Sequence, residues 1–395
     1  MEKKALKDVE VAGKQVLVRV DFNVPVDDDG NVTDETRIEA ALPTINYLQD
    51  EGAKVILMAH FGRPGGEVQE DLRLDPVAKA LAEQLGETVT KTDDTVGSEA
   101  QEAVANLNEG DVLLLENTRF NAGEKSNDDE FAQQLAELAD VYVNDAFGAA
   151  HRAHASTAGV AKYAPEAAAG FLMQNEIETM QPAVEDPEQP YVAIVGGAKI
   201  SDKMSTVENL LGKAEAILIG GGMANTFIKA QGNEVGDSLV EEDQMDLANK
   251  LVDKAEEHGV NLVLPVDVVV ADDFAEDANS KAVAVDEIEA GWQALDIGPE
   301  TIDKFADVLA DAKTVTWNGP LGVFEMDKFA QGTNKVAGVL GDLDATTIVG
   351  GGESAAAVKK AGLEDAVTHI STGGGASLRV IEGKPLPAFD ALDNK

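Results

Sequence analysis

Four arginines in the first half of the chain stand in polar, loop-like sequence near the ends of apolar segments. They are Arg37, Arg63, Arg119 and Arg152, and Asp21, Asn23 and His60 stand in the same segments. Guanidinium groups bind phosphate or carboxylate through paired, charge-assisted hydrogen bonds, each worth about 1.5–3 kcal/mol. One such arginine in an acidic chain is more simply a surface ion pair. Four at the ends of successive strands predict a cleft that binds an anion.

Two lysines of the second half have the spacing of a phosphate site. The segment Val195-Gly-Gly-Ala-Lys199-Ile-Ser-Asp-Lys203 leads from an expected strand into an expected helix. A spacing of four places Lys199 and Lys203 on one helical face, where like charges repel unless an anion lies between them. The preceding glycines and the free N–H groups of a helix start would donate to phosphate oxygens. The alternative is a pair of solvated lysines.

Further glycine-rich segments follow apolar runs in the second half. They are Gly220–Met223, Asn318–Glu325, Gly350–Ser354 and Gly373–Gly375. One triple glycine means little, but a repeated strand-end loop of this kind predicts a cradle for a nucleotide. The sequence has neither the P-loop motif nor the G-x-G-x-x-G fingerprint of dinucleotide sites. Zinc-ligand spacing and a G-x-S-x-G elbow are also absent.

The elements that must position these residues alternate between apolar runs of strand length and segments of helical period. The expected strands are 15–21, 54–60, 111–116, 141–144, 191–195, 216–219, 261–265, 314–317, 346–349 and 369–371. The expected helices include 36–50, 76–85, 128–139 and 241–258, with Asp34 or Thr36 capping the first. This alternation predicts an α/β fold of parallel sheets covered by helices. Ligands of such sheets bind beyond the carboxyl ends of the strands.

A proline-rich stretch predicts a division into two Rossmann-like lobes. Residues 165–180 have a helical pattern, and three prolines within 182–190 then break regular structure before the strand at Tyr191. We therefore expect an N-terminal lobe over residues 1–165, a linker helix over 166–184 and a C-terminal lobe over 185–375.

The composition excludes several classes of protein. Of 395 residues, 73 are Asp or Glu and 31 are Lys or Arg, which gives a formal net charge of −42. Such a charge argues against binding to nucleic acid or to an anionic membrane. The absence of cysteine excludes disulfides and thiolate metal sites. No apolar run is long enough for a membrane span or a secretory signal, so we expect a cytoplasmic protein.

The same charge suggests adaptation to high salt. Self-repulsion destabilises a compact state at low ionic strength, whereas at about 1 M salt the Debye length falls to about 3 Å and most of that repulsion is screened. A carboxylate-rich surface would then keep the protein dissolved in a salt-rich cell. The alternative is an ordinary acidic protein of the cytosol.

Ten motifs, in order over almost the whole chain, resemble those of the phosphoglycerate kinase family. They are RVDFNVP, HFGRP, LENTRF, NDAFGAAHRAHAS, GFLM, GGAKISDK, GGGM, WNGPLGVFE, GGGES and STGGGASL. The resemblance implies reversible phosphoryl transfer between ATP and the carboxylate of 3-phosphoglycerate, with Mg2+, in glycolysis and gluconeogenesis. It also implies a monomer whose first lobe binds phosphoglycerate, whose second binds the nucleotide, and whose hinge closes on both. Residues 376–395 would return to pack on the first lobe.

The same motifs imply roles for particular residues. The phosphoglycerate site would contain Asp21, Asn23, Arg37, His60, Arg63, Arg119 and Arg152. The nucleotide site would contain Lys199, Lys203, Glu325, Gly351, Gly352, Glu353 and Ser354. Arg37, Lys203 and Gly374 would act on the transferred group, with Gly373–Gly375 capping a helix that faces it.

Position 353 departs from the family pattern, which has aspartate where this chain has Glu353. The extra methylene displaces the carboxylate, and Mg2+ tolerates little geometric error. We therefore expect the metal to be carried mainly by the nucleotide.

Two other functions are weighed against this one. A different two-lobed ATP-dependent phosphotransferase would share the arginines but use another small anionic acceptor. A non-catalytic binding protein would need neither Lys203 nor Glu325, so the presence of both argues against it.

Overall fold

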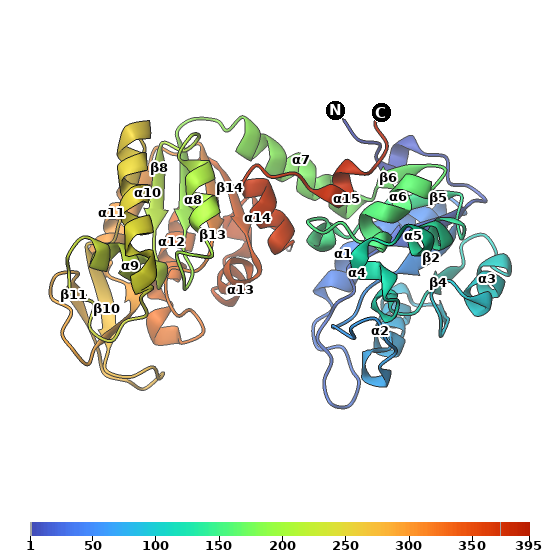
Figure 1. Ribbon diagram of the computed structural model, residues 1–395, viewed down its shortest axis with the longest axis horizontal. Helices are drawn as coiled ribbons and strands as arrows, with labels where there is room; N and C mark the ends of the chain where they lie inside the picture. The colour runs from blue at the N-terminus through green and yellow to red at the C-terminus, as the bar shows by residue number, and fades with distance from the viewer. Residues whose placement is uncertain (1, 372) are drawn as a thin grey trace. The chain divides into compact units, whose positions relative to one another are not determined.

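The computed structural model describes residues 2–371 and 373–395, and the chain forms two compact units. The first unit comprises Met1–Glu178 together with Pro385–Lys395, and the second comprises Thr179–Lys384. Each unit contains a six-stranded, wholly parallel sheet with helices around it (Figure 1). The predicted α/β fold of two parallel sheets covered by helices is confirmed.

The sheet of the first unit has the strand order β3-β4-β2-β1-β5-β6. Its strands are β1 Gln15–Arg19, β2 Lys54–Met58, β3 Thr90–Lys91, β4 Val112–Leu114, β5 Val141–Asn144 and β6 Ala167–Ala169. The helices that belong wholly to this unit are α1 Thr36–Asp50, α2 Asp75–Leu85, α3 Ser98–Ala105, α4 Gly123–Ser126, α5 Asp129–Ala136, α6 Val160–Tyr163 and α15 Pro387–Asp390. The order reverses between β1 and β5, which makes their carboxyl ends the topological switch point, where ligands of such sheets bind.

The sheet of the second unit has the strand order β15-β14-β13-β7-β8-β9. Its strands are β7 Tyr191–Val195, β8 Ala216–Ile219, β9 Asn261–Val263, β13 Thr314–Asn318, β14 Thr346–Gly350 and β15 His369–Ser371. Its helices are α8 Met204–Leu210, α9 Met223–Ala230, α10 Met245–His258, α11 Pro299–Leu309, α12 Gln331–Gly341, α13 Gly352–Lys360 and α14 Gly375–Ile381. Here the order reverses between β7 and β13.

Strand β7 shows why its sequence is apolar without interruption. Val192 and Ile194 pack into a cluster with α11 and α12 on one face of the sheet. The alternate residues Tyr191, Ala193 and Val195 pack with α8, α9 and α10 on the opposite face. Since side chains of a strand alternate between faces, a strand covered on both sides must be apolar throughout.

A third sheet, which the sequence did not predict, lies in the second unit. It is antiparallel with the order β11-β10-β12, and its strands are β10 Asp267–Ala271, β11 Ser280–Ala284 and β12 Gln293–Ile297. The edge strand β11 alternates exposed and half-buried residues, so it lacks the continuous apolar run of the parallel strands.

The segment expected to form one linker helix contains a strand and a shorter helix. Residues Ala167–Ala169 form β6, which pairs with β5, and helix α7 then spans Phe171–Glu185. Pro182 lies inside α7, so the prolines do not end regular structure where the sequence suggested. The boundary between the two units falls within α7, between residues 178 and 179.

The end of the chain returns to the first unit, beginning at Pro385 rather than at residue 376. Helix α14 remains in the second unit, where Ser377 forms a hydrogen bond with Ser371 at the end of β15. After it, Asp393 accepts a hydrogen bond from the backbone N–H of Lys4, and its side chain accepts one from Ala167. The two ends of the chain therefore lie side by side (Figure 1).

Candidate functional site

The neighbouring strands β4, β2, β1 and β5 bring the motifs of the first unit to one edge of the sheet. Asp21 and Asn23 follow β1, His60 and Arg63 follow β2, and Arg119 follows β4. The strands are parallel, so all these loops leave the same edge. Arg37 stands in the first turn of α1, which follows the loop after β1.

Three of the four predicted arginines, Arg37, Arg119 and Arg152, act on His60, and the fourth, Arg63, acts on Arg119. We call Arg37, Arg63, Arg119 and Arg152 the arginine cluster. Burial lowers the pKa of His60 well below its usual value, and the charges of Arg119, Arg152 and Arg37 act in the same direction. Burial likewise lowers the pKa of Arg119, together with the charges of Arg152 and Arg63. The positive charges repel one another and disfavour the protonated forms of His60 and Arg119. A bound anion would reduce this repulsion.

Two members of the cluster are held by neighbouring loops. Arg37 donates to the Asp21 carboxylate at 3.3 Å and to the backbone oxygen of Asn23 at 3.0 Å. Arg119 donates through Nη1 to the backbone oxygen of Gly62 at 2.6 Å, and its buried Nε has no partner among the described residues. The Asn23 side chain accepts from the backbone N–H of Gly62 at 2.9 Å, which ties the loops after β1 and β2 together.

The other two members are exposed. Neither the Arg63 nor the Arg152 guanidinium forms a hydrogen bond or ion pair with the described residues. Their lack of partners favours an external anion.

Behind the cluster lies a buried polar group that the sequence analysis did not assign to the site. Arg19, Glu124 and Ser156 are at most 1% exposed and are joined by hydrogen bonds. His154 lies 3.9 Å from the Glu124 carboxylate, and burial lowers its pKa to about 4. The signal that could have indicated Arg19 is a charge at the end of a strand that is otherwise apolar.

In the second unit, glycine-rich loops meet at the switch point between β7 and β13. A side chain at Gly196 would collide with the backbone oxygens of Pro320 and Gly319. Gly319 has a φ of +93°, and a side chain there would strike the Gly196 carbonyl. The glycines therefore let two loops pack backbone against backbone, and the N–H groups of Gly196 and Gly197 donate to the backbone oxygens of Asn318 and Pro320.

The lysines of this unit do not share a helical face, so that expectation is wrong. Helix α8 begins only at Met204, and Lys203 occupies its N-cap position after a turn. Lys199 lies in the preceding bend with an exposed side chain. The Lys203 ammonium turns inward and donates to the side chain of Asn318 at the end of β13. Burial lowers the pKa of Lys203, although the Glu353 carboxylate opposes this shift.

The remaining predicted residues lie at the carboxyl ends of β13, β14 and β15. Gly351 has a φ of +101° and precedes α13, whose first residues are Gly352, Glu353 and Ser354. The buried Ser354 hydroxyl accepts from the backbone N–H of Gly319 at 2.6 Å. Glu325 is exposed, and Gly374, with a φ of +51°, is the N-cap residue of α14.

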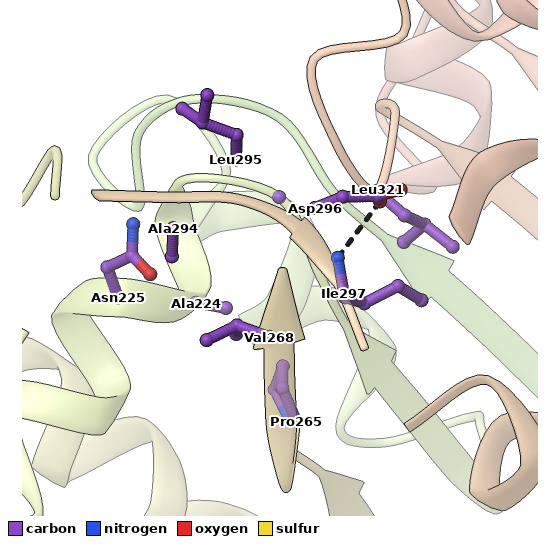
Figure 2. Close-up of a pocket in the computed structure, with 10 residues that line it drawn as sticks. Ala224, Asn225, Pro265, Val268, Ala294, Leu295, Asp296, Ile297 and Leu321 are labelled. Carbon is purple, nitrogen blue, oxygen red and sulfur yellow. Dashed lines mark hydrogen bonds between the residues drawn. The ribbon is translucent and has the colours of Figure 1, made fainter. Parts of the chain in front are cut away.

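A small, mainly apolar cavity opens beside the loop after β8, and the sequence analysis did not find it (Figure 2). It is lined by Gly221, Ala224, Asn225, Pro265, Val268, Ala294, Leu295, Asp296, Ile297 and Leu321. Burial raises the pKa of Asp296 to about 7. Its carboxyl group accepts from the N–H groups of Ile297 at 2.9 Å and Gly332 at 2.7 Å, so it anchors the start of α12.

A family model for phosphoglycerate kinase matches residues 6–384. The chain belongs to the phosphoglycerate kinase family. It is 60% identical over its full length to the whole of a phosphoglycerate kinase from Moorella thermoacetica. It is also 58% identical over 99% of its length to one from Synechococcus elongatus, of which 98% is covered.

Solved structures of the family agree with this assignment. A phosphoglycerate kinase from Coxiella burnetii has a TM-score of 0.90 at 41% identity, with 98% of both chains covered. One from Pyrococcus horikoshii has a TM-score of 0.84 at 35% identity, again with 98% of both chains covered. The predicted family and class of activity, an ATP-dependent kinase of glycolysis, are therefore confirmed, and a phosphotransferase of another family is not favoured.

Among residues 2–371 and 373–395, no helix has the length and apolarity needed to cross a membrane. In the same ranges, no group of three or more His, Asp or Glu side chains is placed to hold a metal ion.

Proposed function

We propose that this chain transfers a phosphoryl group reversibly between ATP and the carboxylate of 3-phosphoglycerate. The observation that carries this proposal is the pair of anion-binding arrangements at the switch points of the two sheets. The first has guanidinium groups, which suit a phosphate and a carboxylate on one small acceptor. The second has an inward-facing lysine, Lys203, and the start of α13 at Gly351 and Gly352, which suit the phosphates of a nucleotide.

For the acceptor, we propose that the arginine cluster binds the phosphate and carboxylate of 3-phosphoglycerate. Arg63 and Arg152 are available because they lack protein partners. Asp21 and Asn23 orient Arg37 through the contacts described above. Asp21, as an acceptor, is also suited to the hydroxyl group of phosphoglycerate.

For the nucleotide, we propose that the phosphates lie along the loops after β7, β13 and β14. Lys199, Lys203 and the amides of Gly351 and Gly352 would donate to them, while Ser354 holds the Gly319 loop in place. Glu325 has an exposed carboxylate suited to the ribose hydroxyls.

The residues present fit a Mg2+ ion that the nucleotide brings with it. Glu353 is exposed and its carboxylate forms no hydrogen bond or ion pair with the described residues. One free carboxylate and no protein cage is the arrangement typical of Mg2+ held mainly by phosphate oxygens and water. Bound there, Mg2+ would neutralise charge on the phosphates.

For the transfer itself, we propose that Arg37 and Lys203 stabilise the charge on the equatorial oxygens of the moving group. The amides after Gly374, at the start of α14, would contribute in the same way. The acceptor carboxylate is ionised near neutral pH, so the reaction needs little proton transfer. Alignment and electrostatic stabilisation then supply most of the rate enhancement.

We further propose that the enzyme acts as a monomer in the cytoplasm of a salt-rich cell. The net charge of −42 supports the salt adaptation, because screening relieves self-repulsion. The family resemblance supports the monomer.

Three variants test the assignment of the acceptor site. In a coupled assay, Arg37→Ala should lower kcat by about 10³-fold or more, with ADP affinity unchanged by titration calorimetry. Arg63→Ala should weaken 3-phosphoglycerate binding about tenfold, since its guanidinium forms no structural contact. Lys125→Ala, the control, removes an exposed cation of the same unit outside the cluster and should change neither quantity. Retention of more than a tenth of the rate by Arg37→Ala would contradict the proposed role.

A further inference from the structure

A chain of hydrogen bonds runs beneath the arginine cluster, from His60 to the buried carboxylate of Glu124. Arg19 Nη2 lies 2.9 Å from His60 Nδ1. Arg19 Nε donates to the Ser156 hydroxyl at 2.8 Å, and that hydroxyl lies 2.6 Å from Glu124 Oε1. All four side chains belong to the first unit and are at most 6% exposed.

The direction of each hydrogen bond follows from the chemistry of the groups. A guanidinium group only donates, so the Ser156 oxygen accepts from Arg19. The Ser156 proton then points to Glu124, which accepts as a carboxylate. Glu124 also accepts from the backbone N–H of Ser156 at 3.0 Å and from the Thr118 hydroxyl at 3.3 Å.

The same reasoning fixes the tautomer of His60. Because Arg19 donates to Nδ1, that nitrogen must carry the lone pair, and the ring proton must be on Nε2. A second proton on Nδ1 would face the guanidinium directly. The groups whose charges act on His60 are Arg19, Arg119, Arg152 and Arg37, all cationic, and they oppose protonation together with burial. His60 is therefore neutral and has one N–H to offer.

Arg19 itself is held in only one orientation. Its Nη1 donates to the backbone oxygen of Val20, its Nε to Ser156 and its Nη2 to His60. The negative charge of Glu124 also raises the pKa of Arg119. Glu124 therefore offsets part of the positive charge of this region. Because these hydrogen bonds fix the Arg19 guanidinium, its hydrogen bond to Nδ1 restrains the orientation of the His60 ring.

We infer that Glu124, Ser156 and Arg19 are positioning residues that hold His60 as a neutral Nε2–H donor toward the phosphoglycerate anion. This inference rests on the proposed function, because it assigns the anion that His60 meets. Its consequence is that His60 contributes a directed hydrogen bond to acceptor binding and contributes no net charge. The contribution should stay constant between about pH 6 and 8, where a free histidine would titrate.

The tautomer can be measured directly in the free enzyme. Long-range 1H–15N correlation spectra of enzyme labelled with 15N-histidine distinguish protonated from unprotonated ring nitrogens. There are five histidines, and a His60→Gln variant assigns the signal. We expect an Nε2–H ring with no titration from pH 6 to 8. An Nδ1–H ring, or a titration near pH 6.5, would overturn the inference.

We call the side chains of Arg19, Ser156 and Glu124 the buried relay, and variants test its role. Ser156→Ala removes the acceptor for Arg19 Nε, so the guanidinium should move away from His60 Nδ1 and the other tautomer should become populated. KM for 3-phosphoglycerate should then rise roughly tenfold, with KM for ATP unchanged. The matched control is Tyr142→Phe, because the Tyr142 hydroxyl donates to the backbone oxygens of Ser156 and Thr157 and to none of the relay side chains. It should leave the His60 spectrum and both KM values as in the wild type. If Ser156→Ala does not fold, Glu124→Gln gives the same measurement.

The outcomes separate this inference from the proposed function. An unchanged spectrum in Ser156→Ala, or a changed tautomer with unchanged KM for 3-phosphoglycerate, would overturn the positioning role. The spectrum of the free enzyme needs no substrate. A wild-type enzyme that shows the Nε2–H ring but fails to bind 3-phosphoglycerate would therefore overturn the proposed function alone.

Discussion

Replacement of Gly196 by alanine tests whether the two loops at the β7–β13 switch point must pack backbone against backbone. The added methyl group would lie against the Pro320 carbonyl oxygen and 2.6 Å from the Gly319 carbonyl oxygen. Both obstacles are backbone atoms, so neither can rotate away. Relief therefore requires a shift of the loop that follows β7 or of the loop that follows β13.

The size of the effect follows from two opposing contributions. Overpacking of this kind costs about 1–3 kcal/mol, and the rigid obstacles favour the upper end. Alanine lowers the conformational entropy of the unfolded chain, which returns about 0.4–1 kcal/mol. We expect a net loss of about 2 kcal/mol for the second unit. Because Lys199, which would face the nucleotide phosphates, moves with the loop after β7, ADP affinity should fall about tenfold as well.

The control is Gly338→Ala, in the interior of α12 of the same unit. No atom lies within 4 Å of the position that its methyl group would take. Alanine should stabilise this helix by about 0.5–1 kcal/mol and leave ADP binding unchanged. Urea unfolding measures the free energy of unfolding, and titration calorimetry measures the affinities for ADP and for 3-phosphoglycerate. If Gly196→Ala keeps both the wild-type stability and the wild-type ADP affinity, the packing argument for this loop is wrong.

Three further predictions concern the metal, salt and pH. Glu353→Asp, which restores the family residue, should lower the Mg2+ concentration for half-maximal rate several-fold without changing KM for 3-phosphoglycerate; an unchanged Mg2+ requirement would remove Glu353 from the metal site. The urea midpoint and the rate should both rise between 0.1 M and about 2 M KCl as repulsion is screened, and full stability at low salt would favour an ordinary acidic protein. Burial raises the pKa of Asp145 to about 6, so the folded state favours the protonated form and this residue destabilises the fold as pH rises through about 4 to 6. The loss of unfolding free energy caused by Asp145→Asn should therefore shrink by up to roughly 3 kcal/mol between pH 4 and pH 7, measured by unfolding at constant ionic strength. A loss that does not change with pH would contradict the raised pKa of Asp145.

The parallel sheets were predictable because burial on both faces leaves a strong trace in the sequence. Helix α1, Thr36–Asp50, has the predicted bounds, and β5, β7 and β8 do as well. The predicted strand 54–60 ends earlier, at Met58, because the last residues leave the sheet for the loop that carries His60. Periodicity finds the buried part of a strand and does not show where hydrogen bonding to its neighbours stops.

Elements without that trace were missed or misassigned. Strand β6 consists of three alanines, which have high helix propensity, and only its pairing with β5 makes it a strand. Strand β3 has two residues and no apolar run. In both cases contact with a neighbouring strand overrides local preference, which a single sequence cannot reveal.

In the candidate site, too, local sequence predicted which residues matter but not the conformations that packing imposes on them. Arg63 and Lys199 could be singled out from the sequence because both are cations in glycine-containing loops that follow strands, and both side chains are exposed in the structure. The helical face predicted for Lys199 and Lys203 was wrong, since a turn at 200–203 delays α8 and sends Lys203 to Asn318. Local spacing predicted the helix, but the loop conformation is set by packing against β13.

The buried relay could not have been predicted from the sequence by any of these signals. Arg19, Ser156 and Glu124 lie on three separate segments, and their meaning comes only from mutual hydrogen bonds. A buried polar group must be paired to avoid a large desolvation cost, so each of these side chains requires the others. The orientation of His60 is therefore a property of the fold as well as of the motif, and the Ser156→Ala spectrum measures that dependence.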